Sequence, residues 1–277
     1  MTNKLAAIRH VALDMDGTIY RGNTLFESTA PFLSLLKDLG IGYTFLTNNP
    51  SRSVTDYLQH LRDIGIVATE QQLYTSTQAT IEYLREDWPH IRRIFVLGTP
   101  SMCQEFAAAG YTIMPDSPNA EPDAVIVGFD TSLSYERLCR AAWWISRGKP
   151  LFATNPDRVC PTDQSTVLVD CGSICAALQA ATGRKPDAVL GKPDPAMIRG
   201  ILHQHSLQPR NLAMVGDRLY TDIAMARQAG ALGVLVLTGE TTAEQAAQAS
   251  PAPDLVVPSL AEFGAKLKEA QSDRIPA

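Results

Sequence analysis

The chain has 277 residues, of which 45% are hydrophobic and 19% charged, so it can bury the core of one large domain or of two smaller ones. Its formal net charge of −5 argues against a nucleic-acid-binding protein, which usually carries a basic face, and no apolar run approaches the length of about 18 residues expected of a membrane span. The five cysteines include no C-x-x-C pair, and residues 1–10 lack the apolar run of a signal peptide. We therefore expect a cytoplasmic protein without nucleic-acid or membrane partners.

Short β-like runs alternate with amphipathic helical patterns along most of the chain. Near the N-terminus, "HVALD" and "IGYTFLTNN" predict strands, and "APFLSLLKDLG" and "SVTDYLQHLRDIG" predict helices. The middle adds strand candidates in "RRIFVLGT", "PDAVIVGFD" and "KPLFATN", and helix candidates in "PSMCQEFAAAG" and "SYERLCRAAWWISRG". Towards the C-terminus, "NLAMVGD" and "LGVLVLTG" predict strands on either side of a helix in "YTDIAMARQAG". This alternation predicts an α/β fold with a mainly parallel sheet.

Polar side chains gather where these strands end. Ligands of open α/β sheets bind beyond the carboxyl ends of the strands, so these side chains are candidates for a functional site. They comprise four carboxylates, one lysine and one hydroxyl-amide corner: Asp14 and Asp16, Thr47 with Asn48 and Asn49, Lys192, and Asp217 with Asp222 a turn or so further on.

Such a set of side chains suits phosphoryl transfer. Converging carboxylates repel one another and favour a hard cation such as Mg²⁺, which accepts few protein carboxylates. A carboxylate can also attack phosphorus as a covalent nucleophile, and the charge on the transferred group needs a cation, a lysine, hydroxyls or backbone amides around it. Because the turn at Gly17 lets Asp16 swing away from the strand that ends at Asp14, one carboxylate can attack while the other protonates the leaving oxygen. The residues alone do not rank Asp14 above Asp16.

Four segments, in this order, resemble the four motifs of the haloacid dehalogenase-like hydrolases: "LDMDGTIY", "FLTNN", "GKPDP" and "GDRLYTD". The resemblance implies that Asp14 is the nucleophile, and that Asp16 is the general acid and base, with its backbone carbonyl on the metal. It also implies that Lys192 neutralises the charge of Asp14 and of the phosphoryl group. Thr47 and the Asn48 amide would hold that group, with Asn49 in the same phosphate-binding corner. Mg²⁺ would be held by Asp14, Asp16 and Asp217, with Asp222 binding it directly or lying just behind these ligands.

The spacing between motifs predicts a second domain. Thr47 and Lys192 are 145 positions apart, far more than one crossover connection needs. We therefore expect a Rossmann-like, parallel-sheet core of residues 1–80 and 184–277, with an α/β cap domain of residues 81–183 inserted between the second and third motifs.

Further segments resemble one branch of this family, which contains NagD-like, nitrophenylphosphatase-like and phosphoglycolate phosphatase-like enzymes. They are "TNNPSRS", "VGFDTSLSYERL", "LFATNPDRVCPT" and "ATGRKPDAVLGKPDPAMI". The chain departs from that branch at "VDCGSICAAL", where a Pro-Gly-x-Gly-Ser turn is expected and Asp170, Cys171, Gly172 and Ser173 stand instead. This departure bears on the loop expected to lead from cap to core, and so on substrate choice.

The resemblance implies a Mg²⁺-dependent phosphatase that hydrolyses small phosphomonoesters through an aspartyl phosphate on Asp14. The expected substrates are sugar phosphates, phosphoglycolate or nucleotide monophosphates, with p-nitrophenyl phosphate as an artificial substrate. The alternatives are a phosphotransferase or mutase that uses the same intermediate, and a non-catalytic phosphate-binding regulatory module. The second alternative is disfavoured because no nucleophile, lysine or metal ligand is missing. Caps often pair in this branch, which implies a homodimer.

Several other residues have two interpretations. Asn155, Asp157, Asp130 and Cys171 either face the substrate or serve as turn and core residues of the cap. Trp143 and Trp144 are adjacent on one predicted helix and so point to different faces, which places one in the cap core and the other at an interface. His203 and His205 lack a partner at metal-ligand spacing, and we expect them at the surface.

Overall fold

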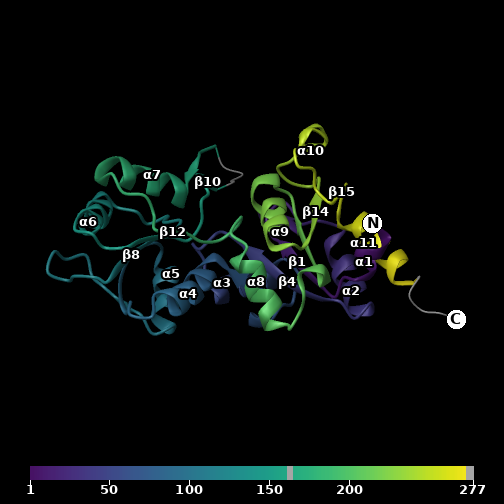
Figure 1. Cartoon of the computed structure of the whole chain (residues 1–277), viewed down its shortest axis with the longest axis horizontal. Helices are drawn as coiled ribbons and strands as arrows, with labels where there is room; N and C mark the ends of the chain where they lie inside the picture. The colour runs from purple at the N-terminus through teal and green to yellow at the C-terminus, as the bar shows by residue number, and fades with distance from the viewer. Residues whose placement is uncertain (161–164, 273–277) are drawn as a thin grey trace. The chain divides into compact units, whose positions relative to one another are not determined.

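The computed structural model describes residues 1–160 and 165–272, and the chain divides into two compact units (Figure 1). Unit 1 consists of Met1–Leu46, Leu58–Tyr74 and Pro193–Ala277, and unit 2 of Thr47–Tyr57 and Thr75–Lys192. Residues 81–183, the predicted cap, all fall in unit 2. The predicted limits of core and cap stay predictions. Within the described ranges, no helix is both long enough and apolar enough to cross a membrane.

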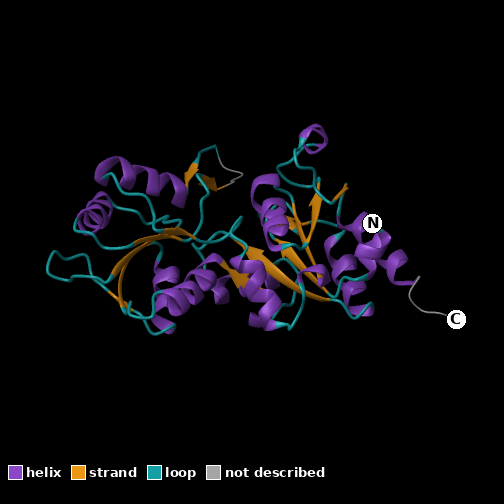
Figure 2. Ribbon diagram, viewed as in Figure 1, coloured by secondary structure: helices purple, strands orange, loops and turns teal. Residues whose placement is uncertain are grey.

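Unit 1 is built on a sheet of mainly parallel strands, drawn in orange in Figure 2. β1 pairs in parallel with β13 on one side and β4 on the other, and β14 pairs in parallel with β13 and β15. All five residues of β1 are buried, as expected for a central strand without polar alternation. Among the described residues, the strand order is β15 (Leu255–Val257), β14 (Leu232–Val236), β13 (Leu212–Gly216), β1 (His10–Asp14), β4 (Gly42–Thr47) and β5 (Leu73–Thr75).

Helices flank this sheet, and the first lies beside the last. α2 buries Phe32 and Leu36, four residues apart on one face. α11 packs against both α1 and α2 (Figure 1). The helices that lie wholly or partly in unit 1 are α1 (Thr2–Ala6), α2 (Thr29–Asp38), α3 (Val54–Asp63), α8 (Ala196–Gln204), α9 (Ala224–Ala229), α10 (Ala243–Gln248) and α11 (Leu260–Ser272), with short 3₁₀ turns at Glu70–Gln72 and Pro209–Asn211 and a small hairpin of β2 (Tyr20–Arg21) and β3 (Thr24–Leu25).

The helix predicted in "YTDIAMARQAG" begins with a π-helical turn, which the sequence pattern did not predict. Leu219–Ile223 form one π-helical turn, η3, before α9 begins. The Asp222 carboxylate accepts a hydrogen bond from the backbone N–H of Arg218 at 3.2 Å. This side-chain contact lies within the widened turn, and π-helical turns often occur at functional sites.

Unit 2 has its own parallel sheet, in the order β12 (Ala188–Val189), β9 (Leu151–Ala153), β8 (Ala124–Val127), β6 (Arg93–Leu97) and β7 (Thr112–Ile113) among the described residues. It also contains α4 (Ser76–Asp87), α5 (Pro100–Ala108), α6 (Tyr135–Ser146), α7 (Cys171–Thr182) and the hairpin of β10 (Val159–Cys160) and β11 (Leu168–Val169). Trp144 lies in the core beside Val125 and Leu151, as predicted for one tryptophan of the pair. Trp143 is 48% exposed, with the Arg147 guanidinium 5.3 Å from its ring centroid.

The first residue of β1 makes the stability of unit 1 depend on pH. The buried His10 ring lies 2.9 Å from the Thr44 hydroxyl and stacks on the His205 ring. Burial, and to a smaller extent the charge of His205, lowers the pKa of His10 to about 4. The unfolded chain binds this proton near pH 6.5, so the stabilising contribution is complete above about 6.5 and is lost as the pH falls towards 4.

We expect His10 to account for a loss of about 2 kcal/mol of unfolding free energy between about pH 7.5 and about pH 5. Urea unfolding at the two pH values measures this loss. His10→Gln retains a polar side chain beside Thr44 but does not titrate, so it should reduce the difference. An unchanged pH dependence in this variant would assign the effect to other groups.

Candidate active site

Asp14 ends β1 and is followed by a tight turn. Its side chain is buried and accepts a hydrogen bond from the Thr18 hydroxyl at 3.2 Å. Gly17 has a φ of +86°, and its N–H donates to the carbonyl of Tyr20 at 2.8 Å. A Cβ at Gly17 would lie 2.5 Å from an oxygen of Asp217. The turn therefore needs glycine both for its backbone conformation and for the space that the Asp217 carboxylate occupies.

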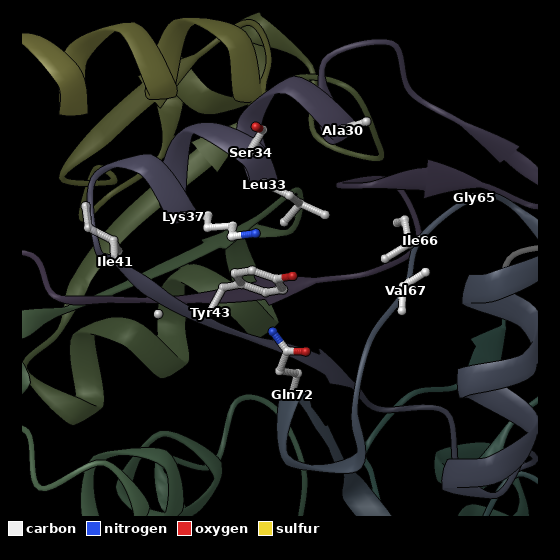
Figure 3. A pocket seen from close by; sticks show the side chains of 11 residues that line it. Ala30, Leu33, Ser34, Lys37, Ile41, Tyr43, Gly65, Ile66, Val67 and Gln72 are labelled. Carbon is white, nitrogen blue, oxygen red and sulfur yellow. The ribbon is translucent and has the colours of Figure 1, made fainter.

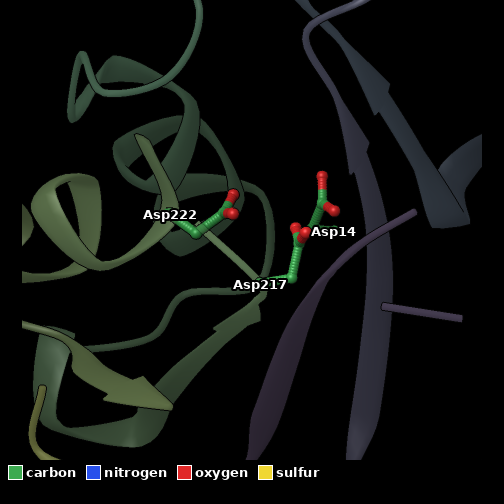
Figure 4. A group of neighbouring side chains, drawn as sticks. All are labelled: Asp14, Asp217 and Asp222. Atoms are coloured by element: carbon green, nitrogen blue, oxygen red, sulfur yellow. The ribbon is translucent and has the colours of Figure 1, made fainter. Parts of the chain in front are cut away.

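Three buried carboxylates meet at the carboxyl end of the unit 1 sheet. Asp14, Asp217 and Asp222 each offer an oxygen, and these three atoms all lie within 4.8 Å of one another (Figure 4). We call these residues the aspartate cluster. Asp217 directly follows β13, and Asp222 comes from the η3 turn. A Cβ on Gly239 would collide with the Asp217 carboxylate, so only glycine at position 239 leaves room for this carboxylate.

The aspartate cluster is electrostatically costly without a cation. Asp217 accepts a hydrogen bond from the Glu240 N–H at 2.6 Å through one oxygen, and its other oxygen is buried with no hydrogen-bond partner among the residues that the structure describes. Burial, followed by the charges of Asp14 and Asp222, raises the pKa of Asp217 to about 7. Buried like charges are stable when a cation compensates them, and oxygen-only donors suit Mg²⁺. The donor set thus fits a divalent cation held by these three residues.

An arginine beside the aspartate cluster was not anticipated from the sequence. Arg218 directly follows Asp217, and its Nε lies 2.9 Å from a carboxylate oxygen of Glu240. Burial lowers the pKa of Arg218, but the negative charges around it, that of Asp14 foremost, raise it above its usual value. The only signal in the sequence was a cation placed directly after a strand-ending aspartate.

Asp16 lies outside the three-carboxylate group. Asp16 is exposed to solvent, and its backbone forms an isolated β-bridge with Tyr20. Partial burial of the carboxyl group, and then the charge of Asp14, raise the pKa of Asp16, while Arg218 and Arg21 oppose this shift. A carboxyl group with a raised pKa holds its proton more readily, as a general acid requires. Its metal contact through the backbone carbonyl stays a prediction.

The structure brings Asn48 of the second motif and Lys192 of the third motif together within unit 2. The backbone N–H of Lys192 donates to Oδ1 of Asn48 at 2.7 Å, and Nδ2 of Asn48 donates to the Lys192 carbonyl at 3.0 Å. Both residues are buried. Gly191 has a φ of +74°, and a Cβ there would lie 2.7 Å from Oδ1 of Asn48. We call Thr47, Asn48 and Lys192 the Asn48 corner; Thr47 is also buried, and its hydroxyl lies 3.3 Å from that of Tyr57.

The remaining predicted candidates have contacts within unit 2. Asn49 accepts a hydrogen bond from the Ser51 N–H at 2.9 Å, a contact typical of a turn. Asp130 is buried in an ion pair with Arg137 at 2.7 Å, and the Cys171 thiol donates to the carbonyl of Val127 at 3.2 Å. Both contacts suit the structural interpretation of these two residues. Asn155 and Asp157 both bond to Asn48.

A cavity of about 460 Å³ lies at the other end of the unit 1 sheet (Figure 3). Its walls include Ile41, Gly42 and Tyr43 at the start of β4, together with Lys37 and Gln72. Asp14 pairs in parallel register with Leu46, near the end of the same strand. The cavity is therefore separate from the aspartate cluster.

A parallel α/β sheet with clustered carboxylates beyond its strand ends, a donor set that fits a divalent cation, is typical of the metal-dependent class of α/β proteins. A family model described as "Haloacid dehalogenase-like hydrolase" matches residues 11–112, and one described as "HAD-hydrolase-like" matches residues 189–263. The chain belongs to the haloacid dehalogenase-like hydrolases, in their NagD-like branch.

Relatives cover nearly the whole chain. Ribonucleotide monophosphatase NagD of Escherichia coli K12 is 32% identical over 256 residues, which span 92% of this chain and 98% of that protein. The structure of a 4-nitrophenylphosphatase from Thermotoga maritima matches with a TM-score of 0.89 and 40% identity, over 95% of this chain and 98% of that one. A glycerol phosphate phosphatase from Mycobacterium tuberculosis, solved in complex with magnesium, matches with a TM-score of 0.84 and 31% identity, over 95% and 77%.

Proposed function

We propose that this protein is a Mg²⁺-dependent phosphatase of small phosphomonoesters that works through an aspartyl phosphate on Asp14. The aspartate cluster carries this proposal: the proposed nucleophile Asp14 has an oxygen within 4.8 Å of oxygens of Asp217 and Asp222, a donor set that suits a cation, and one buried oxygen of Asp217 has no hydrogen-bond partner within the described ranges. The relatives support the same class of reaction: their names include a ribonucleotide monophosphatase, an acid sugar phosphatase and a D-glycerol 3-phosphate phosphatase.

In the proposed first step, an oxygen of Asp14 forms a bond to phosphorus while the bond from phosphorus to the ester oxygen breaks. Asp16 gives its proton to the leaving oxygen. In the second step Asp16 removes a proton from water, the water oxygen bonds to phosphorus, and the bond to Asp14 breaks. The raised pKa of Asp16 suits the first of these proton transfers.

The other residues have supporting roles in this proposal. Asp14, Asp217 and Asp222 hold Mg²⁺, together with the backbone carbonyl of Asp16. The bound ion supplies positive charge that reduces the repulsion between carboxylate and phosphate. In the Asn48 corner, the Thr47 hydroxyl and the Asn48 backbone amide bind phosphoryl oxygens, and Lys192 neutralises their charge. Asn49 belongs to the same phosphate-binding loop.

A phosphate-release assay tests this function. We expect hydrolysis of p-nitrophenyl phosphate with Mg²⁺, loss of activity with EDTA, and recovery when Mg²⁺ is added back. A panel of sugar phosphates, glycerol phosphates, phosphoglycolate and nucleoside monophosphates then identifies the substrate class. Activity that persists unchanged in EDTA would contradict a cation-dependent site, and the absence of phosphate release across the panel would contradict the phosphatase assignment.

The alternatives differ in what the same assay records. A phosphotransferase or mutase would phosphorylate an added acceptor in preference to releasing phosphate, and a regulatory module would bind phosphate esters without turnover. Homodimerisation and a cytoplasmic location stay predictions from the sequence.

A further inference from the structure

The Asn48 side chain has no hydrogen left to offer a substrate. Its Nδ2 donates to the Lys192 carbonyl and also to a carboxylate oxygen of Asp157, at 2.9 Å. Its Oδ1 accepts from the backbone N–H of Lys192. Both amide hydrogens are thus used within the protein. The Asn48 side chain therefore links the backbone of Lys192 to the carboxylate of Asp157, two residues that are far apart in the sequence.

Asn155 forms a hydrogen bond with the backbone of Asn48. Its Nδ2 donates to the Asn48 carbonyl at 3.0 Å, and its Oδ1 accepts from the N–H of Asp157 at 2.9 Å. Asn155 is fully buried, so a lost hydrogen bond here would not be replaced by bulk water. The Ser76 hydroxyl is a second donor to the Asn48 carbonyl, at 2.8 Å.

The first turn of α7 fixes the segment that carries Asn155 and Asp157. The N–H of Gly172 donates to the Asp157 carbonyl at 2.7 Å, and the Ser173 hydroxyl donates to the Arg158 carbonyl at 2.7 Å. A Cβ at Gly172 would collide with the carbonyl of Pro156. Here the chain departs from the Pro-Gly-x-Gly-Ser pattern. These residues begin a helix that Asp170 caps, rather than forming a loop that leads out of unit 2.

We propose that Asn155 and Asp157 are positioning residues, which fix Asn48 and through it the backbone of Lys192 for binding of the transferred phosphoryl group. This inference rests on the proposed role of Lys192 and Asn48 in phosphate binding. It assigns opposite requirements to the two positions. Position 155 must donate a hydrogen bond to the Asn48 carbonyl, whereas position 157 must accept one from the Asn48 amide.

The isosteric exchange of amide and carboxylate at each position tests these requirements. Asp157→Asn keeps an oxygen that can accept from Nδ2 of Asn48, so its kcat should stay within about threefold of the wild type. Asp157→Leu removes the acceptor, and Asn155→Asp sets an acceptor against the Asn48 carbonyl. Both should lower kcat by about 10- to 100-fold and weaken inhibition by inorganic phosphate, since small displacements of binding groups have effects of this size. Asn119→Asp, an exposed site in unit 2, is the matched control for added charge.

Amide hydrogen exchange at Lys192, followed by NMR, gives a readout that does not depend on activity. The Lys192 N–H bonds to Asn48, so its protection should fall in Asn155→Asp and Asp157→Leu and persist in Asp157→Asn. If the wild type releases no phosphate, the proposed function fails while this exchange pattern still tests the positioning role. If Asn155→Asp does not fold, the two Asp157 variants retain the contrast.

Two results would overturn the inference. Equal kcat and equal Lys192 protection in all variants would show that neither side chain positions the Asn48 corner. An Asp157→Asn enzyme as impaired as Asp157→Leu would show that the charge of Asp157 matters, which indicates direct action on a substrate or cation. Melting temperatures of all variants identify any that merely lose stability, because a purely structural role would lower the melting temperature without changing the kcat of the folded enzyme.

Discussion

Asp14→Asn should lower turnover of p-nitrophenyl phosphate by at least about 10⁴-fold and leave no phosphorylated protein after rapid quenching. An amide oxygen is a poor nucleophile towards phosphorus, and the resulting adduct could not follow the normal hydrolytic path. The variant should fold normally, because the amide oxygen of asparagine can still accept the hydrogen bond from the Thr18 hydroxyl. Rapid-quench mass spectrometry of the intact protein measures the phosphate adduct directly.

Asp16→Asn is the informative partner variant, since it should fail in a different way. It keeps the nucleophile but loses the proton donor, so the phosphoenzyme should form slowly and also hydrolyse slowly. The defect in formation should be smaller with p-nitrophenyl phosphate than with an alkyl phosphate, because p-nitrophenolate needs little protonation to leave. If the two variants fail identically, including in the amount of adduct trapped, the division of roles between Asp14 and Asp16 is wrong.

The aspartate cluster could be predicted because local patterns determine where its members lie. An unbroken apolar run predicts a buried parallel strand, and parallel strands bring their carboxyl ends to one edge. Asp14 after "HVAL" and Asp217 after "NLAMVG" were therefore expected at the same edge of the sheet, and because β1 pairs with β13 their oxygens lie within 4.8 Å of each other. The glycine of the first motif was also predictable, since a turn directly after a buried strand often needs a positive φ.

Contacts between distant residues could not be predicted in the same way. The two hydrogen bonds between Asn48 and Lys192 join positions 144 residues apart, and the one from Asn48 to Asp157 joins positions 109 apart. Nothing in the local pattern around Asn155 distinguishes a turn from a positioning role, and both interpretations stayed open. The ion pair of Arg218 with Glu240 and the π-helical turn at Asp222 likewise depend on tertiary packing.

Removing one negative charge from the aspartate cluster should make the metal-free protein more stable and the enzyme less active. We expect Asp217→Asn to raise the unfolding free energy of the metal-free protein by roughly 2 kcal/mol near pH 8, because it removes one of three like charges in a buried site. The asparagine can keep the hydrogen bond from Glu240 through its amide oxygen. For a chain of this size, the change corresponds to a rise in melting temperature of about 4–8 °C. Activity should fall by at least about 10²-fold because a cation ligand is lost.

Added Mg²⁺ should reverse the order of stability. A ligand that binds only the folded state stabilises it by about 2.7 kcal/mol at 100 times its dissociation constant, and the wild type should gain this while Asp217→Asn gains much less. Thermal melts in EDTA and across a Mg²⁺ titration measure both effects, with Asp38→Asn, an exposed site in unit 1, as the control for net charge. If Mg²⁺ stabilised all three proteins equally, the ion would bind elsewhere. If the metal-free variant were less stable than the wild type, the hydrogen bonding of Asp217 would outweigh the repulsion within the cluster.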